Sequence, residues 1–150
     1  MSEYIVAKTV FKAEHLDCLV EALQEAAPQF KGHVEVHEKA VQLEGYGGDQ
    51  RAQRANVVVR RQFVQASAND LGFETMPDGS VIGHISEYDS GKYGKTFLNT
   101  LSQHYALKVT EKQAARIGAT LEKVVQPDGS WKITLVKPNP GLAVVVGRKW

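Results

Sequence analysis

The stretch LGFETMPDGSVIGHISEY, residues 71–88, decides the fold class because two alternating β segments flank a tight turn. In Pro-Asp-Gly, proline presets the first turn position, aspartate suits the second, and glycine supplies the positive φ that closes a hairpin. Pro-Asp-Gly-Ser recurs at residues 127–130, ahead of the alternating segment WKITL. A phosphate-binding loop would instead require a helix after the turn, and the residues around the two turns do not align as a duplication. Both stretches therefore predict antiparallel hairpins.

The segments outside these hairpins predict further strands and two helical regions. Residues 3–11 alternate as a strand, and leucines at helical spacing predict a helix over 14–27 that ends at Pro28. A second helical region, 93–118, is expected to break near Lys108 and to restart at Thr110, where Gln113 would complete a capping box and Gly118 would end the helix. Short strands are predicted at 32–38, 40–48 and 56–64.

These elements predict an α+β fold with a mainly antiparallel sheet of about six to eight strands and two helical regions packed on one face. The 150 residues, 43% of them hydrophobic, suit a single domain over 1–150. Because Pro138 and Pro140 interrupt the chain, residues 138–150 are expected to be an edge strand or a partner-binding tail.

Composition limits the partners that the chain is expected to bind. Eighteen basic and seventeen acidic residues give a net charge of +1, so no global field attracts nucleic acid or anionic lipid. No segment approaches the ~20 apolar residues of a membrane span, and the single cysteine, Cys18, excludes a disulfide framework. We therefore expect a cytoplasmic protein without membrane association.

Metal and nucleophilic sites find little support in the residue patterns. His33 and His37 flank Glu35, but residues four apart on a strand lie about 13 Å from each other, too far to share an ion. Cys18 falls roughly opposite the leucine stripe of its helix, so we expect it to be exposed and without a histidine partner. No metal and no cofactor is expected.

Two other features could carry function. The loop EGYGGDQR, residues 44–51, combines glycines with an aromatic residue and an arginine, although no helix follows as a nucleotide site requires. Arg51, Arg54, Arg60 and Arg61 lie between Asp49 and Asp70 with no acid among them, a local basic patch that could contact nucleic acid.

Several motifs together resemble one family. They are VQLEGYGG at 41–48, ANVVVR at 55–60, SEYDS at 86–90, FLNTLSQHYA at 97–106 and GRKW at 147–150. Their order is similar to that of the conserved hypothetical chloroplast reading frame thirty-five family, a domain of unknown function found in plastids, cyanobacteria, other bacteria and some phages. Asn56 replaces an acid of the family pattern, and SEYDS lacks its tryptophans. The resemblance implies no known catalytic activity and implies an association with AAA+ ATPases.

The sequence thus predicts a non-enzymatic accessory or adaptor module that binds a protein partner, such as an AAA+ ATPase or a phage assembly component. The alternatives are a nucleic-acid-binding protein that uses the arginines, and a small-molecule enzyme around Tyr46, Asp89 and His104. The expected partner-binding residues are Gly45, Tyr46, Gly48, Arg51, Arg60, Asp89, Gln103, Tyr105, Arg148 and Trp150.

Overall fold

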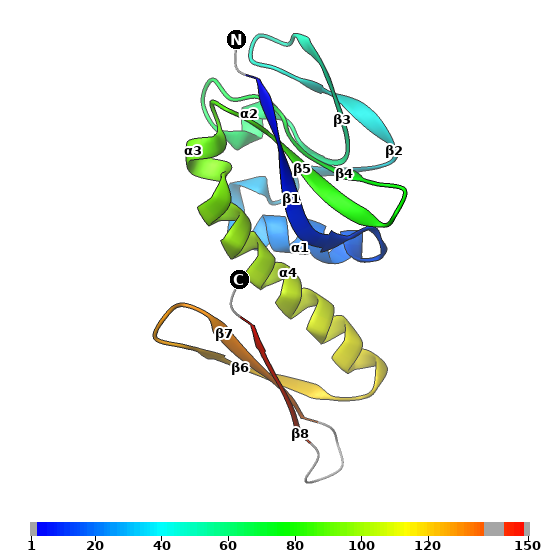
Figure 1. The fold of residues 1–150 in the computed structure, drawn as a ribbon, viewed down its shortest axis with the longest axis vertical. Coiled ribbons are helices and arrows are strands. Elements are labelled where there is room, and N and C mark those ends of the chain that lie inside the picture. Colours follow the sequence, from blue (N-terminus) through cyan, green and yellow to red (C-terminus); the bar gives the residue numbers. More distant parts are fainter. Residues whose placement is uncertain (1–2, 137–142, 149–150) are drawn as a thin grey trace.

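The computed structural model describes residues 3–136 and the backbone of 143–148 (Figure 1). Its α+β architecture is confirmed, with every strand pairing antiparallel, but the strands form two sheets instead of one. The larger sheet has the order β1-β5-β4-β3-β2, and the smaller has the order β6-β7-β8. The strands are β1 (Tyr4–Lys12), β2 (Val34–Glu44), β3 (Gln50–Val59), β4 (Leu71–Thr75), β5 (Ser80–Ser86), β6 (Thr120–Val125), β7 (Trp131–Val136) and β8 (Ala143–Arg148).

Helices cover one face of the larger sheet, as the sequence predicted (Figure 1). The long helices are α1 (Leu16–Ala26) and α4 (Lys95–Arg116), and the short ones are α2 (Arg61–Val64) and α3 (Ser90–Tyr93), with single 3-10 turns at Ala13–His15 and Pro28–Phe30. No helix of the described residues is both long enough and apolar enough to cross a membrane.

Both Pro-Asp-Gly-Ser stretches form the predicted hairpin turns, joining β4 to β5 and β6 to β7. In the first, Gly79 has φ +85°, and Asp78 Oδ1 accepts a hydrogen bond from the backbone N–H of Ser80 at 2.9 Å. In the second, Gly129 has φ +86°, and the equivalent bond to Asp128 is 3.0 Å long. The turn chemistry therefore accounts for the repeated motif.

The core lies between the larger sheet and the helices. Phe11 of β1 packs edge-on against Phe73 of β4 and Tyr105 of α4, with ring centroids 5.8 and 4.8 Å apart. The prediction that Cys18 is exposed is wrong, because its exposed fraction is 3%. Helix α1 packs against α4 as well as the sheet, so more than one side of the helix is covered.

Helix α4 is continuous, so the predicted break near Lys108 and restart at Thr110 are wrong. Thr110 Oγ1 donates to the carbonyl of Ala106 at 2.7 Å, a bond that fits a helix interior and leaves the hydroxyl unavailable for capping. The predicted end is confirmed. Gly118 has φ +67°, and the N–H of Ala119 donates to the carbonyl of Ala114 at 2.9 Å, as in a Schellman motif.

Strand β2 runs through the region where the sequence predicted two short strands. Its register with β3 shifts between Val36 and Val41. Asn56 of β3 spans the irregularity, since its Nδ2 donates to the carbonyls of His37 and Glu38 at 3.1 Å each. A bulge held by a side chain thus replaces the expected turn.

The strand predicted over 56–64 ends at Val59, and Arg61–Val64 forms the helical turn α2. The N–H of Arg61 donates to Asp70 Oδ1 at 2.8 Å instead of joining the sheet. The strand prediction was therefore wrong beyond Val59, because the backbone N–H of Arg61 donates to the buried carboxylate of Asp70 and not to a neighbouring strand.

The sheet face that carries no helix has its own small apolar cluster of Leu43, Ala55 and Val58. Val58 alternates with Val57 and Val59, which face the helices. At the edge strand β1, Val6 and Val10 remain 58% and 49% exposed. Apolar side chains at the β1 edge of this face therefore remain accessible to solvent.

Candidate functional site

Four buried polar residues gather where the connections after β2, α2 and β5 meet. Asn69, Asp70, Ser86 and Asp89 are each at most 2% exposed. They are joined to one another and to Arg60 by hydrogen bonds, either directly or through the backbone of their neighbours. We refer to these five residues as the loop network.

Asp70 is the charged centre of the loop network, and its side chain has no exposed surface. Its Oδ2 accepts hydrogen bonds from Arg60 Nη1 and from the N–H of Glu44, each 2.8 Å long. Arg60 also reaches Glu35 Oε2 at 3.0 Å. Burial opposes the charge of Arg60, but its bonds to Glu35 and Asp70 outweigh burial and raise the pKa of the guanidinium. Asp70 therefore fixes both β2 and α2 to β3.

Asp89, at the start of α3, likewise accepts several hydrogen bonds through both carboxylate oxygens. Its Oδ1 accepts a hydrogen bond from Gln65 Nε2 at 2.6 Å, and its Oδ2 accepts from Ser86 Oγ at 2.7 Å and from the N–H of Asn69 at 3.0 Å. A buried carboxylate that accepts this many hydrogen bonds holds the surrounding backbone in place. Asp89 thus ties the α2–β4 connection to the end of β5.

Asn69 links the loop network to the glycine loop at 45–49. Its Oδ1 accepts from the N–H of Tyr46 at 2.9 Å, and its Nδ2 donates to Ser86 Oγ at 2.9 Å. Within the loop, the N–H of Gly45 donates to the carbonyl of Asp49 at 2.8 Å, while Gly48 adopts φ +86°, which favours glycine. The loop is therefore closed by its own backbone hydrogen bond and held in place by the side chain of Asn69.

Arg51 follows the glycine loop and packs beside it. Its Nε lies 2.8 Å from Asp49 Oδ2, and its guanidinium carbon lies 5.7 Å from the centre of the Tyr4 ring. The hydroxyl of Tyr4 donates to the carbonyl of Asp70 at 2.6 Å. These contacts connect β1 to the loop network.

Six of the ten residues singled out from the sequence belong to the loop network or lie directly against it: Gly45, Tyr46, Gly48, Arg51, Arg60 and Asp89. Asn69 and Asp70 were not predicted from the sequence, and Ser86 was quoted only as part of the SEYDS motif. The one signal for Asn69 and Asp70 is that Asp70 closes the acid-free stretch after Asp49 and immediately precedes a strand.

The other four predicted residues lie elsewhere. Tyr105 belongs to the core, and its hydroxyl accepts from the N–H of Lys12 at 3.0 Å. Gln103 is half-buried on α4. Arg148 pairs with Trp131 through the backbone of β8, and Trp150 lies outside the described residues.

The loop network holds the adjoining loops in place, because the carboxylates of Asp70 and Asp89 already accept hydrogen bonds from within the protein. Two aromatic side chains next to it are exposed: Tyr46 by 61% and Tyr88 by 54%. Tyr46 is held through its N–H by Asn69, and Tyr88 directly precedes Asp89. We call these two side chains the tyrosine pair.

His104, the third residue of the enzyme hypothesis, is not part of this arrangement. Its Nδ1 lies 3.2 Å from Glu25 Oε2, and its ring contacts Trp131 with centroids 5.1 Å apart. Tyr46 and Asp89 share Asn69, whereas His104 joins α4 to α1 and to the smaller sheet. The structure therefore does not bring the three together.

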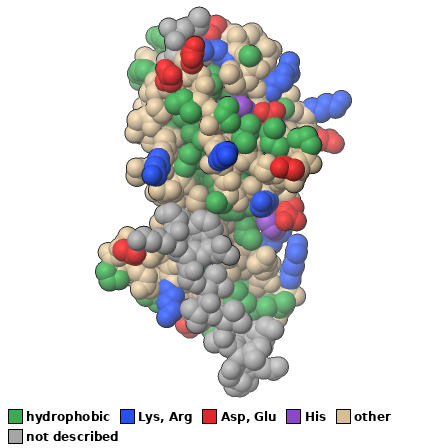
Figure 2. Space-filling model, viewed as in Figure 1, with side chains coloured by type: hydrophobic (Ala, Val, Ile, Leu, Met, Phe, Trp, Pro, Cys, Tyr) green, Lys and Arg blue, Asp and Glu red, His purple; other side chains and the backbone are tan. Residues whose placement is uncertain are grey.

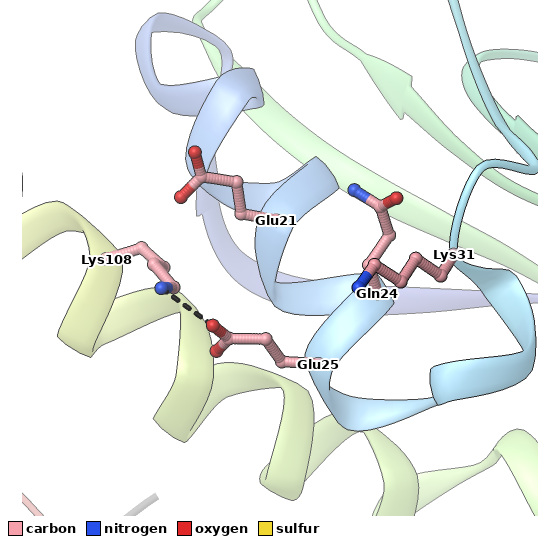
Figure 3. Close-up of a pocket in the computed structure, with 5 residues that line it drawn as sticks. All are labelled: Glu21, Gln24, Glu25, Lys31 and Lys108. Atoms are coloured by element: carbon pink, nitrogen blue, oxygen red, sulfur yellow. Dashed lines mark ion pairs between the residues drawn. The ribbon is translucent and has the colours of Figure 1, made fainter.

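A pocket of about 360 Å³ opens between α1 and α4. Figure 3 shows its lining, with Glu21, Gln24 and Glu25 from α1, Lys108 from α4 and Lys31 from the segment after α1. Lys108 Nζ lies 2.7 Å from Glu25 Oε1. Burial opposes the ionisation of Glu25, but bonds from Lys108 and His104 keep its pKa below the ordinary value, and the bond to Glu25 raises the pKa of Lys108. Both groups are thereby held in their charged forms, which does not suit general acid–base catalysis near neutral pH.

The arginine patch is divided by ion pairs. Arg60 is engaged by Glu35 and Asp70, and Arg51 by Asp49. On the face shown in Figure 2, the Lys and Arg side chains are dispersed, several of them beside acidic side chains. This arrangement leaves less free positive charge than the sequence indicated.

The histidines considered as metal ligands in the sequence have other contacts. The ring of His33 stacks on Phe63 with centroids 3.7 Å apart, and His37 Nε2 lies 2.8 Å from Glu35 Oε1. Among the described residues, the group of metal-capable side chains that does converge is His15, Asp17 and Cys18.

Fold and site together define an α+β protein of two antiparallel sheets whose buried polar groups support surface loops. The chain belongs to the family described as protein of unknown function (DUF1257), whose model matches residues 30–134. That range includes the glycine loop and every member of the loop network. No curated protein matches the chain, and no solved structure matches it.

Proposed function

We propose that this protein is a non-enzymatic adaptor that binds a protein partner through the tyrosine pair. The observation that carries the proposal is the contrast between two exposed tyrosines, Tyr46 and Tyr88, and the fully hydrogen-bonded network beside them.

Tyrosine is well suited to such a surface. It contributes a large apolar ring and a hydroxyl while having only two side-chain torsions to immobilise, and it is enriched among the residues that dominate binding energy at interfaces. The loops that carry both side chains are already ordered by Asn69 and Asp89. Binding would therefore require little additional ordering of the backbone, which lowers its entropic cost.

The proposal includes the finer expectations drawn from the motifs. These place the chain in the chloroplast reading frame thirty-five group and make its partner an AAA+ ATPase or a phage assembly component. A cytoplasmic location is part of the same proposal, since a single cysteine, Cys18, suits a reducing compartment.

Site-specific photo-crosslinking in cells that naturally express the chain tests the proposal. A photoreactive amino acid replaces Tyr46 or Tyr88, and an exposed residue of α1, Glu21, serves as the control position. We expect a discrete adduct with the same protein from both tyrosine positions and none from position 21. Adducts of equal pattern from all three positions, or none from the tyrosines, would contradict the proposal.

A pair of double variants then separates binding from folding. Tyr46→Ala with Tyr88→Ala should reduce affinity for the crosslinked partner by at least about tenfold, as expected for two interface anchors. Val124→Ala with Val125→Ala removes hydrophobic side chains of similar exposure, 56% and 59%, from the smaller sheet and should leave affinity unchanged. Equal losses in both double variants would show that the tyrosine pair has no special role.

A further inference from the structure

Three side chains with different metal-binding atoms converge at the beginning of α1. His15 ends the 3-10 turn before the helix, and Asp17 and Cys18 lie in its first turn. One nitrogen of His15, one oxygen of Asp17 and the sulfur of Cys18 lie within 4.8 Å of one another. This convergence was not predicted, because the leucine spacing placed Cys18 on the exposed side of the helix.

The donor set is the one that zinc prefers. Nitrogen from histidine, sulfur from cysteine and oxygen from a carboxylate are its usual protein ligands, and a pair of ligands three residues apart is a common spacing in zinc sites. His15 and Cys18 have that spacing across a helix start. A tetrahedral ion 2.0–2.3 Å from each ligand separates ligand atoms by about 3.5 Å, so contraction by about 1 Å would complete the coordination.

The imidazole of His15 provides an independent indication. Its Nδ1 is buried and has no hydrogen-bond partner, although a buried polar atom without a partner is costly and uncommon. Its Nε2 lies 3.9 Å from Glu14 Oε1. Histidines that bind a metal through one nitrogen characteristically direct the other toward a carboxylate or carbonyl. The unpartnered Nδ1 is consistent with that arrangement, whereas the 3.9 Å between Nε2 and Glu14 is too long for a hydrogen bond.

A cation already occupies the outer side of the cluster. Lys112 of α4 places its Nζ 3.0 Å from Asp17 Oδ2 and 3.2 Å from Asp17 Oδ1. Asp17 can therefore either pair with this ammonium group or turn its carboxylate to an ion held by His15 and Cys18. Lys112 would compete with the metal for the same carboxylate.

From this geometry we propose that His15, Asp17 and Cys18 form a binding site for one divalent ion of the zinc class, with a fourth coordination position open to water or another ligand. The ion would fasten the start of α1 and release Lys112 from Asp17. The site lies outside the residues that match the family model, and it is independent of the tyrosine pair.

Titration of the purified full chain with Co²⁺ tests this site directly. Cobalt bound to a thiolate gives a charge-transfer absorption that cobalt bound only to nitrogen and oxygen lacks. We expect this absorption to saturate at one Co²⁺ per chain and to be abolished by addition of Zn²⁺, which binds more tightly to such ligands.

Substitutions identify the ligands. Cys18→Ser should remove the charge-transfer absorption, and His15→Gln and Asp17→Asn should each weaken Co²⁺ binding by about tenfold or more, the range seen when groups that support a metal site are removed. His37→Gln is the matched control, because His37 also lies beside a carboxylate but has no thiol nearby, and it should bind as the unaltered chain does.

Lys112→Ala provides the sharpest test because it retains all three ligands and alters a side chain outside the core. Removing the competing ammonium should tighten Co²⁺ binding. Unchanged or weaker binding by the Lys112→Ala chain would overturn the proposal. So would absence of the charge-transfer absorption from the unaltered chain, or its persistence in Cys18→Ser.

Discussion

Arg60 Nη1 and Asp70 Oδ2 form an ion pair 2.8 Å long in which the carboxylate is completely buried. The partners lie only ten positions apart in sequence, and the chain between them contains α2 and the connection to β4. Because the same carboxylate also accepts from the backbone of Glu44 and Arg61, one side chain determines the path of two connections. Stability and loop geometry should therefore both depend on this pair.

Asp70→Asn should lower the free energy of unfolding by about 3 kcal/mol, the lower end of the cost of breaking a buried ion pair, because Arg60 keeps its bond to Glu35. The substitution also places an amide N–H₂ group among donors. Urea unfolding monitored by circular dichroism measures the change. Asp49→Asn is the control, because the Asp49 side chain is 36% exposed and its pair with Arg51 should contribute at most about 1 kcal/mol. Equal effects of the two substitutions would refute a special role for Asp70.

Gly72→Ala should be poorly tolerated. A methyl group on Gly72 would lie 2.6 Å from the Cβ of Ala55 and 3.0 Å from the methyl carbons of Leu43. Relief of this overlap must displace the hairpin of β2 and β3, at a cost of about 1–3 kcal/mol. At Gly83 the same methyl would meet its nearest neighbour at 3.5 Å, an ordinary contact, so Gly83→Ala should change stability by less than about 1 kcal/mol. Thermal unfolding of the two variants distinguishes these outcomes.

Thr110→Ala tests the continuity of α4. If Thr110 capped a new helix, its replacement would destabilise the protein by about 0.5–2 kcal/mol. Inside a helix, alanine is instead favoured over threonine by about 0.5 kcal/mol, so we expect a small gain in stability. Thr100→Ala should behave similarly, because Thr100 also donates to the carbonyl four residues earlier. A loss confined to Thr110→Ala would argue for a helix break.

The phenol of Tyr4 should make stability depend on alkaline pH. Burial and then the charge of Asp70 raise the pKa of Tyr4 far above its ordinary value of 10.0. Above pH 10 the unfolded chain loses this proton while the native protein keeps it, so the native state is progressively disfavoured. At neutral pH, Tyr4→Phe should cost about 1 kcal/mol through loss of the hydrogen bond to Asp70.

The difference in free energy of unfolding between the unaltered chain and Tyr4→Phe should shrink as pH rises above 10. Only the unaltered chain has the phenol whose ionisation in the unfolded state disfavours the native state. Urea unfolding of both proteins from pH 8 to pH 11 provides the measurement. A difference that stays constant over this range would contradict the assigned environment of Tyr4.

Local chemistry allowed parts of the fold to be predicted from sequence. The Pro-Asp-Gly-Ser turns and the helix end at Gly118 each depend on φ preferences and hydrogen bonds within a few residues. The error at Thr110 had a local origin too, because its hydroxyl can either cap a helix or bond the carbonyl four residues before it. Division of the strands into two sheets depends on pairing between distant segments, such as β1 with β5, and no local pattern determined it.

The candidate site was predictable only in part. Glycines and the aromatic side chain at 45–48 drew attention to a loop that does lie against the network. Asn69 and Asp70 were missed because their importance comes from burial and from hydrogen bonds to distant residues, such as Glu44, 26 positions from Asp70, and Tyr4, 66 positions from it. Cys18 was misplaced because the helix periodicity marks the side that faces the sheet and not the additional side covered by α4.

The smaller sheet has consequences for how the chain opens. Of the described residues in β6 and β7, Ile133 is the one that reaches the buried core set. Segments with little apolar burial open at a lower free energy than the rest of a protein, and their amides exchange with solvent through those local openings. We therefore expect amides of β6 and β7 to exchange with deuterium well before those of β3 and β4. The chain should behave as a strongly cooperative unit up to the end of α4, followed by a second unit that unfolds and refolds while the first remains intact.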